Sequence, residues 1–143
     1  MITPVPEGRG HVVLSHTADT GIEAWAPDLE SLFEECAAAM FALMYPRADP
    51  LPSPHIAVEA AGNGVEELLV AWLSELLYIA EVTEVALCAF RVDSLTSTTV
   101  RGRAAGPPVS EIKLLGPPIK AVTYHGLTVA CNGSCRARVI VDV

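Results

Sequence analysis

The chain has 143 residues, of which 51% are hydrophobic and 18% charged, enough for one domain with a core that needs neither disulfides nor a structural metal. Its formal net charge of −8 argues against broad contact with a nucleic-acid backbone and for a protein partner or a cation. No apolar run approaches the roughly 18 residues of a membrane span, and residues 1–7 lack the features of a secretory signal. We therefore expect a single domain over residues 1–143, located in the cytoplasm and without membrane contact.

The first half of the chain predicts two strands, a helix and a third strand. Residues 11–15 are β-prone and residues 22–26 alternate between apolar and polar positions. Asp28 is suited to cap the helix predicted over residues 29–44, where apolar side chains recur at three- and four-residue spacing. The prolines between residues 45 and 54 exclude a helix there, and residues 55–60 alternate like a strand.

The second half predicts one more helix followed by strands. Residues 65–80 form a helix with a wide apolar face that includes Trp72, which we interpret as a core residue. Strands are predicted over residues 86–93, 98–103 and 119–125, and a hairpin over residues 127–131 and 135–141. The expected fold is α+β, with a mostly antiparallel sheet and two main helices packed on one face in two layers. The other face of the sheet is then open to solvent or to a partner.

Four cysteines are present, without the CxxC pairs of a zinc site. Asn132-Gly133 signals a two-residue hairpin turn, which would place Cys131 opposite Ser134 and Cys135 on the other side of the sheet. A loop one residue longer would bring the two cysteines opposite each other, and a disulfide between them would then be possible. From the two-residue turn we expect four reduced thiols.

Acidic groups that could act together follow the first predicted strand and end the last one. Asp19 follows the first predicted strand, whereas Asp142 and the carboxylate of Val143 end the last one. If these ends meet, their oxygens form a hard site suited to Ca²⁺ or Mg²⁺. On residue types alone, a turn cap at Asp19 and a solvated strand end at Asp142 are the commoner explanations. His16, His125 and Glu75 are accessory candidates near such a site.

Motifs of common enzymes are absent from the sequence. There is no Walker loop, GxSxG, HExxH or GxGxxG pattern. Arg91, Arg101 and Arg103 fall on neighbouring predicted strands, but three arginines without an aromatic platform are a weak nucleic-acid signal. A small metal-dependent enzyme and a general RNA or protein chaperone nevertheless remain as alternatives to a partner-dependent function.

Several segments together resemble the archease family over nearly the whole chain. They are His16-Thr17-Ala18-Asp19 with Gly21-Ile22, the helix over residues 29–44, and the stretches 66–77, 119–125 and 139–143. The resemblance implies a non-catalytic accessory protein that activates an RtcB-type RNA ligase in tRNA splicing and RNA repair. The ligase would join RNA ends through a guanylylated histidine, with GTP and a divalent metal, and RNA such as tRNA halves would be reached only through the ligase.

The resemblance also implies roles for particular residues. The metal-binding acids of the family match Asp19 and Asp142, with Val143 contributing oxygen, and the cation is expected to be Ca²⁺ rather than Mg²⁺. The functional lysine of the family matches Lys120, which would contact the partner or a phosphate. The chain departs from the family pattern at Ala71 and at Gly116-Pro117-Pro118, which leaves the details of the partner contact open.

Overall fold

A computed structural model of the protein describes residues 8–15, 20–48 and 51–143. Its strands form two antiparallel sheets, one with the order β1-β2-β7-β6 and the other with the order β3-β5-β4. The strands are β1 (Gly10–Ser15), β2 (Thr20–Ala26), β3 (Ile56–Ala61), β4 (Ala89–Leu95), β5 (Thr99–Ala105), β6 (Ala121–Asn132) and β7 (Ser134–Asp142). The helices are α1 (Leu29–Ala42), α2 (Val65–Thr83) and a 3-10 turn, η1 (Val109–Glu111).

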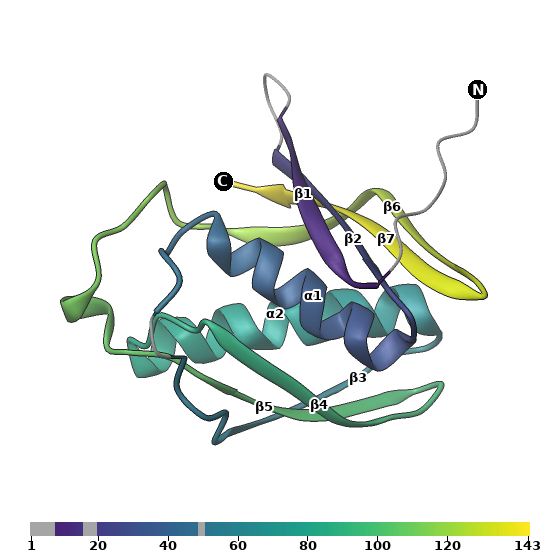
Figure 1. Cartoon of the computed structure of the whole chain (residues 1–143), viewed down its shortest axis with the longest axis horizontal. Helices are drawn as coiled ribbons and strands as arrows, with labels where there is room; N and C mark the ends of the chain where they lie inside the picture. Colours follow the sequence, from purple (N-terminus) through teal and green to yellow (C-terminus); the bar gives the residue numbers. More distant parts are fainter. Residues whose placement is uncertain (1–7, 16–19, 49–50) are drawn as a thin grey trace.

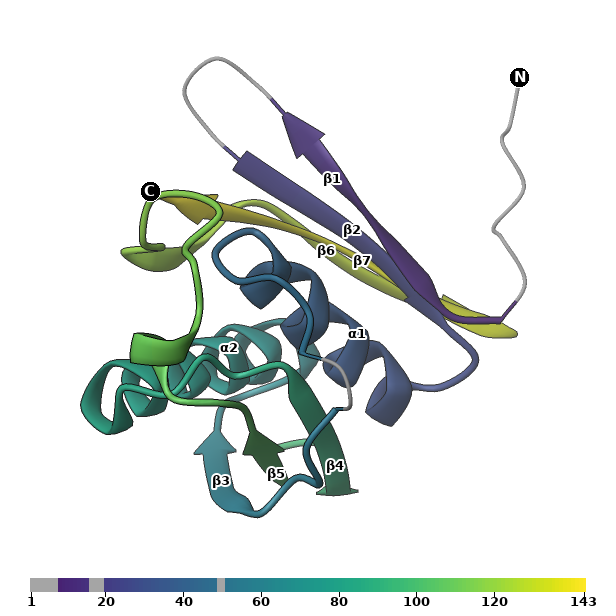
Figure 2. The ribbon, with the colours of Figure 1, turned by 60° about the vertical axis from the view of Figure 1, so that its left-hand side comes forward.

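The predicted α+β class with two main helices and antiparallel strands is confirmed. The strands divide into two sheets, however, and both helices lie between them (Figures 1 and 2). A helix between two sheets must bury side chains on more than one stripe. On α1 the buried residues indeed surround much of the helix and include small ones: Leu32, Phe33, Cys36, Ala37, Ala39, Met40 and Phe41.

The two helices meet in the centre of the core. Trp72 of α2 is fully buried, as predicted, and its indole N–H donates a hydrogen bond to the carbonyl of Phe33 on α1 at 3.1 Å. The Trp72 ring also lies over Gly102 of β5, where an added Cβ would come within 2.8 Å of the ring. The absence of a side chain at Gly102 therefore lets the second sheet approach the helices closely. Neither helix is long and apolar enough to cross a membrane among the residues described.

The hairpin between β6 and β7 corrects the prediction of four reduced thiols. Asn132 pairs with Ser134 and Cys131 with Cys135, so only Gly133 separates the last pair, and the register differs by one residue from that of the predicted two-residue turn. A type I′ turn needs a positive φ at both central residues, but only Gly133 has one in this loop, at +79°. The two cysteines consequently face each other and form a disulfide, while Cys36 and Cys88 are free.

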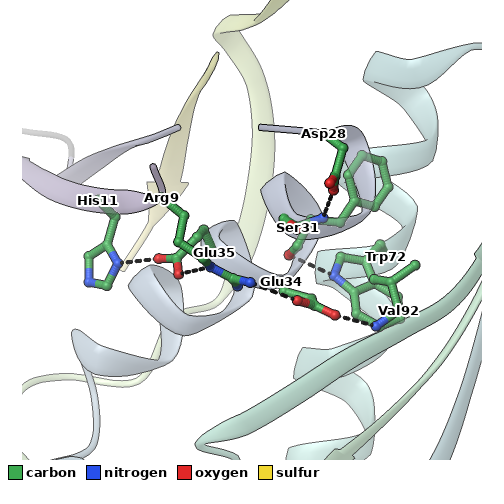
Figure 3. A network of polar contacts seen from close by, with 9 residues as sticks. Arg9, His11, Asp28, Ser31, Glu34, Glu35, Trp72 and Val92 are labelled. Carbon is green, nitrogen blue, oxygen red and sulfur yellow. Dashed lines mark hydrogen bonds and ion pairs between the residues drawn. The ribbon is translucent and has the colours of Figure 1, made fainter. Parts of the chain in front are cut away.

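A polar network holds β1 against α1 and α1 against the second sheet (Figure 3). Arg9, just before β1, binds the carboxylates of Glu34 at 3.1 Å and Glu35 at 2.7 Å, and His11 contacts Glu35 at 3.0 Å. The second oxygen of Glu34 accepts the backbone N–H of Val92 on β4 at 2.8 Å. Two adjacent glutamates thus link both sheets to α1 and fix the strand that leads to the stretch around Asp19.

This network makes stability dependent on pH in a defined direction. Burial alone would raise the pKa of Glu35, but hydrogen bonds from His11 and Arg9 outweigh it and lower the pKa below the ordinary 4.5. A lowered carboxyl pKa stabilises the fold above the unfolded value, and this contribution is lost as the pH falls through the folded value. We expect Glu35→Gln to reduce the free energy of unfolding in urea at pH 7, and to reduce it by less at pH 3, where more of the carboxylate is protonated.

The exposed Glu81 of α2 offers a matched control for this experiment. Glu81→Gln removes the same charge without breaking the network, so its free energy of unfolding should stay near that of the unmodified chain at both pH values. An equal loss from Glu35→Gln at pH 3 and at pH 7 would contradict the proposed linkage.

Candidate functional site

Lys120 is fixed beside the end of the last strand. Its backbone N–H donates a hydrogen bond to the carbonyl of Asp142 at 2.8 Å, and the next residue, Ala121, is the register partner of Asp142. Ile119 on the other side is buried, and its N–H contacts the Met44 sulfur at 3.3 Å. The backbone is therefore anchored on both sides of Lys120, while the lysine itself is exposed.

The predicted position of Lys120 within a strand is wrong by one residue. β6 starts at Ala121 and continues to Asn132, with a shift of register between Thr123 and Thr128 where a separate strand end was expected. Gly126 adopts a positive φ of +66° inside this irregular stretch. Such an irregularity at a glycine bends the strand but keeps it in the sheet. For this reason β6 continues past Gly126 and does not end there as predicted.

A surface cleft of about 620 Å³ lies next to Lys120, between α2 and the segment that leads into β6. Tyr78 and Glu81 of α2 line it, together with Pro118. Tyr78 is 59% exposed although it is a large, partly apolar side chain. An ammonium group beside an exposed aromatic ring and a carboxylate is a suitable surface for a protein partner.

Of the acids predicted to bind a metal, the structure describes Asp142 and the terminal Val143, at the end of β7 in the four-stranded sheet. Asp142 and Val143 are exposed. Thr20, which follows Asp19 in the chain, pairs with Val141, which precedes Asp142. Asp19 and His16 lie outside the described residues, and within the described ranges no three His, Cys, Asp or Glu side chains form a metal-binding group. Asp142 and Val143 carry carboxylate oxygens, which are the type of ligand that Ca²⁺ and Mg²⁺ prefer.

The other accessory candidates are His125 and Glu75. His125 is exposed on β6 and Glu75 is half-buried on α2. Among the described residues, no hydrogen bond or ion pair links either of them to Lys120 or Asp142.

Two of the three arginines on the three-stranded sheet are engaged with acids. Arg101 pairs with Glu59 at 3.3 Å, and Arg103 forms two hydrogen bonds of 3.0 Å with the carboxylate of Asp93. These pairs neutralise two of the three charges that could have faced a phosphate backbone. The arrangement is typical of a solvated sheet face.

Sequence reasoning missed the contribution of Tyr78 and Met44 to the surface around Lys120. Tyr78 lies outside the apolar face predicted for the second helix. An aromatic residue on the polar face of a helix could have indicated an exposed contact surface. The contact of Met44 with Ile119 joins residues 75 positions apart, which no local pattern indicates.

Comparisons with known proteins give a consistent result over nearly the whole chain. A model of the Archease protein family (MTH1598/TM1083) matches residues 12–143. Protein archease of Methanosarcina mazei is 33% identical over 143 residues, which cover 96% of this chain and 98% of that protein. Protein archease of Sulfolobus acidocaldarius is 31% identical, covering 90% of this chain and 94% of its own length.

A solved structure agrees with these sequence matches. The solution structure of Methanobacterium thermoautotrophicum protein 1598 superimposes with a TM-score of 0.76 at 30% identity. The superposition covers 94% of this chain and 99% of the other one. The same α+β arrangement is thus found in an experimentally determined relative.

Proposed function

Because this chain belongs to the archease family, we propose that it is a non-catalytic accessory protein that activates an RtcB-type RNA ligase in tRNA splicing and RNA repair. The observation that carries the proposal is the hydrogen bond between the backbone of Lys120 and the carbonyl of Asp142. It supports a shared surface for two residues, a lysine and an acid, that the family resemblance singled out separately. The ligase would perform the chemistry, and this protein would promote its guanylylation and repeated turnover.

A divalent cation belongs to the proposal. Asp19, Asp142 and the terminal carboxylate of Val143 would hold it, with Ca²⁺ favoured over Mg²⁺ because flexible sets of carboxylate oxygens suit the larger ion. The exposed position of Asp142 and Val143 supports this role, since their oxygens are open to an ion or to a partner. The cation would neutralise the repulsion among three negative charges and add a positive charge near Lys120.

The alternatives gain less support from the described residues. A general RNA chaperone needs free cationic groups, whereas Arg101 and Arg103 are paired with acids and the chain carries a charge of −8. A small metal-dependent enzyme needs a substrate site with positioned acid or base groups. The acids at the end of β7 are instead exposed on an open surface, which suits contact with a partner better.

The proposal is tested by an RNA ligation time course with limiting ligase from the same organism and excess RNA. We expect this protein alone neither to join nor to cut RNA, and to increase the number of ligation events per ligase molecule. A heat-denatured sample of the same preparation serves as the control. Equal turnover with and without the folded protein would refute the proposal.

A further inference from the structure

The disulfide between Cys131 and Cys135 closes the hairpin of β6 and β7, at the opposite end of the sheet from the C-terminus (Figure 1). Its two cysteines differ in environment. Cys135 is 5% exposed and belongs to the hydrophobic core, whereas Cys131 is exposed. A thiol can exchange with a disulfide only where it reaches one of the two sulfurs. The bond is therefore open to attack from one side, at Cys131.

The fold does not depend on this bond. The two cysteines are four positions apart in the chain, and a disulfide that closes so short a loop constrains the unfolded chain little. Ala137 and Val139 of β7 are buried, and β7 pairs with β2 from Cys135 to Val141. Core packing and strand pairing thus hold β7 in place, and we expect the hairpin to remain folded when the bond is reduced.

The register of the strands keeps the two thiols opposite each other after reduction. Cys135 pairs with Ala26 of β2, which fixes β7, and Val129 of β6 packs against the core. A slip of β6 by one residue would turn Val129 to the other face of the sheet. The loss of this apolar contact opposes the slip, so Cys131 stays opposite Cys135 and the bond can form again.

The other two cysteines are less reactive than Cys131. Cys36 is fully buried, and burial raises the pKa of its thiol to about 12. Cys88 is half-buried, and burial raises the pKa of its thiol as well. Since the thiolate is the reactive form, both cysteines are poor partners for exchange at neutral pH. In the reduced protein, Cys131 is consequently the most accessible of the four thiols.

We propose that Cys131 and Cys135 form a reversible thiol–disulfide pair that exchanges electrons with a dithiol, in which Cys131 is the exchanging sulfur and Cys135 the resolving one. In reduction, a thiolate of the dithiol attacks the sulfur of Cys131 and the bond to Cys135 breaks. Cys135 leaves as a thiolate and takes up a proton. The site lies away from Lys120, and the proposal does not depend on the function proposed above.

A second exchange completes the reaction. The remaining thiolate of the dithiol attacks its own sulfur in the mixed disulfide and releases Cys131, which takes up a proton. Two electrons and two protons have then passed to the protein, and the dithiol has become a disulfide. In the reverse direction, Cys131 forms a mixed disulfide with the oxidised partner, and the thiolate of Cys135 resolves it.

The first test is a redox titration of the Cys88→Ser variant with mixtures of reduced and oxidised dithiothreitol, without denaturant. Quenched samples are labelled with a maleimide in urea and weighed by mass spectrometry. We expect full conversion to a form that carries two more labels, and full return on oxidation. Amide NMR spectra of the two forms should differ around the hairpin and agree elsewhere. A bond that stays closed in excess reduced dithiothreitol and opens only in urea would overturn the proposal.

The second test separates the roles of the two sulfurs. In the Cys88→Ser background, Cys135→Ser leaves Cys131 as a free thiol, and Cys131→Ser leaves Cys135. The variant with a free Cys131 should react at least about tenfold faster with the aromatic disulfide dithiobis(nitrobenzoate), because its thiol is accessible. It should also accumulate the mixed disulfide, which the intact pair releases by closing its own bond.

Equal rates for the two serine variants, or a faster reaction of the variant with a free Cys135, would overturn the proposal. The redox titration uses the intact pair, so it decides the proposal even if a serine variant fails to fold. Neither result bears on ligase stimulation.

Discussion

Replacing Lys120 with alanine is expected to abolish most of the ligase stimulation while leaving the fold intact. The side chain is exposed, and the contacts that hold this position come from the backbone and from the neighbouring Ile119. The free energy of unfolding should therefore change by no more than about 0.5 kcal/mol, as is usual for surface positions. The loss of stimulation follows because an ammonium group beside the Asp142 end can reach a carboxylate of the ligase or a phosphate.

Lys113 offers a matched control for this experiment. It is an exposed lysine in the loop before β6 and it does not line the cleft next to Lys120. Lys113→Ala should retain stimulation of guanylylation, measured as radiolabel transferred from GTP to the ligase. If Lys120→Ala unfolds like the unmodified protein and stimulates guanylylation as well as Lys113→Ala does, Lys120 has no part in the site.

Local patterns predicted the helices well because the relevant interactions lie within a few residues. Asp28 accepts the backbone N–H of Ser31 at 2.8 Å, as expected for a helix cap. The main shortfall is at the helix ends, where α1 stops at Ala42 and α2 continues to Thr83. Helix ends depend on a single cap or the next packing contact, so sequence periodicity does not define them.

The division of the strands into two sheets could not be predicted from the same patterns. The second buried face of α1 is formed partly by small residues such as Ala37 and Ala39. A search for large apolar side chains at helical spacing does not count alanines, so it missed this face. The register of two paired strands decides which residues lie opposite each other, for example Gly10 of β1 and Trp25 of β2, and the local patterns do not contain this information. In the last hairpin, a single residue in the loop decides whether Cys131 meets Ser134 or Cys135, and the turn signal did not resolve that difference.

The candidate site was predicted through a resemblance and not through geometry. Spacing alone favoured a solvated lysine and a solvated strand end, and both side chains are indeed exposed. What spacing did not predict is the backbone hydrogen bond that joins Lys120 to Asp142. The contact between the rings of Phe41 and Phe90 escaped prediction, because the two residues lie far apart in the sequence and each fits a core position by itself. Long-range contacts of this kind require the fold to be known.

Ca²⁺ is expected to stabilise the protein, and Asp142→Asn or Asp19→Asn should each remove that response. The unfolded chain cannot hold both acids at one ion, so a cation that binds the folded state raises its stability by mass action. With Ca²⁺ at 100 times its dissociation constant, the gain is about 2.7 kcal/mol. The unmodified protein should therefore melt at a higher temperature in Ca²⁺ than in chelator, whereas the two variants should melt at the same temperature in both.

The control for this experiment is Glu111→Gln, which removes an exposed carboxylate in η1, away from the end of β7. Its melting temperature should rise with Ca²⁺ as much as that of the unmodified chain, because the proposed ligands remain. Mg²⁺ should give a smaller rise than Ca²⁺ at equal concentration, since it requires a rigid octahedral arrangement and gives up its water reluctantly. Identical melting in Ca²⁺ and in chelator for the unmodified protein would contradict the cation site, and an equal rise in the Asp142→Asn variant would remove Asp142 from it.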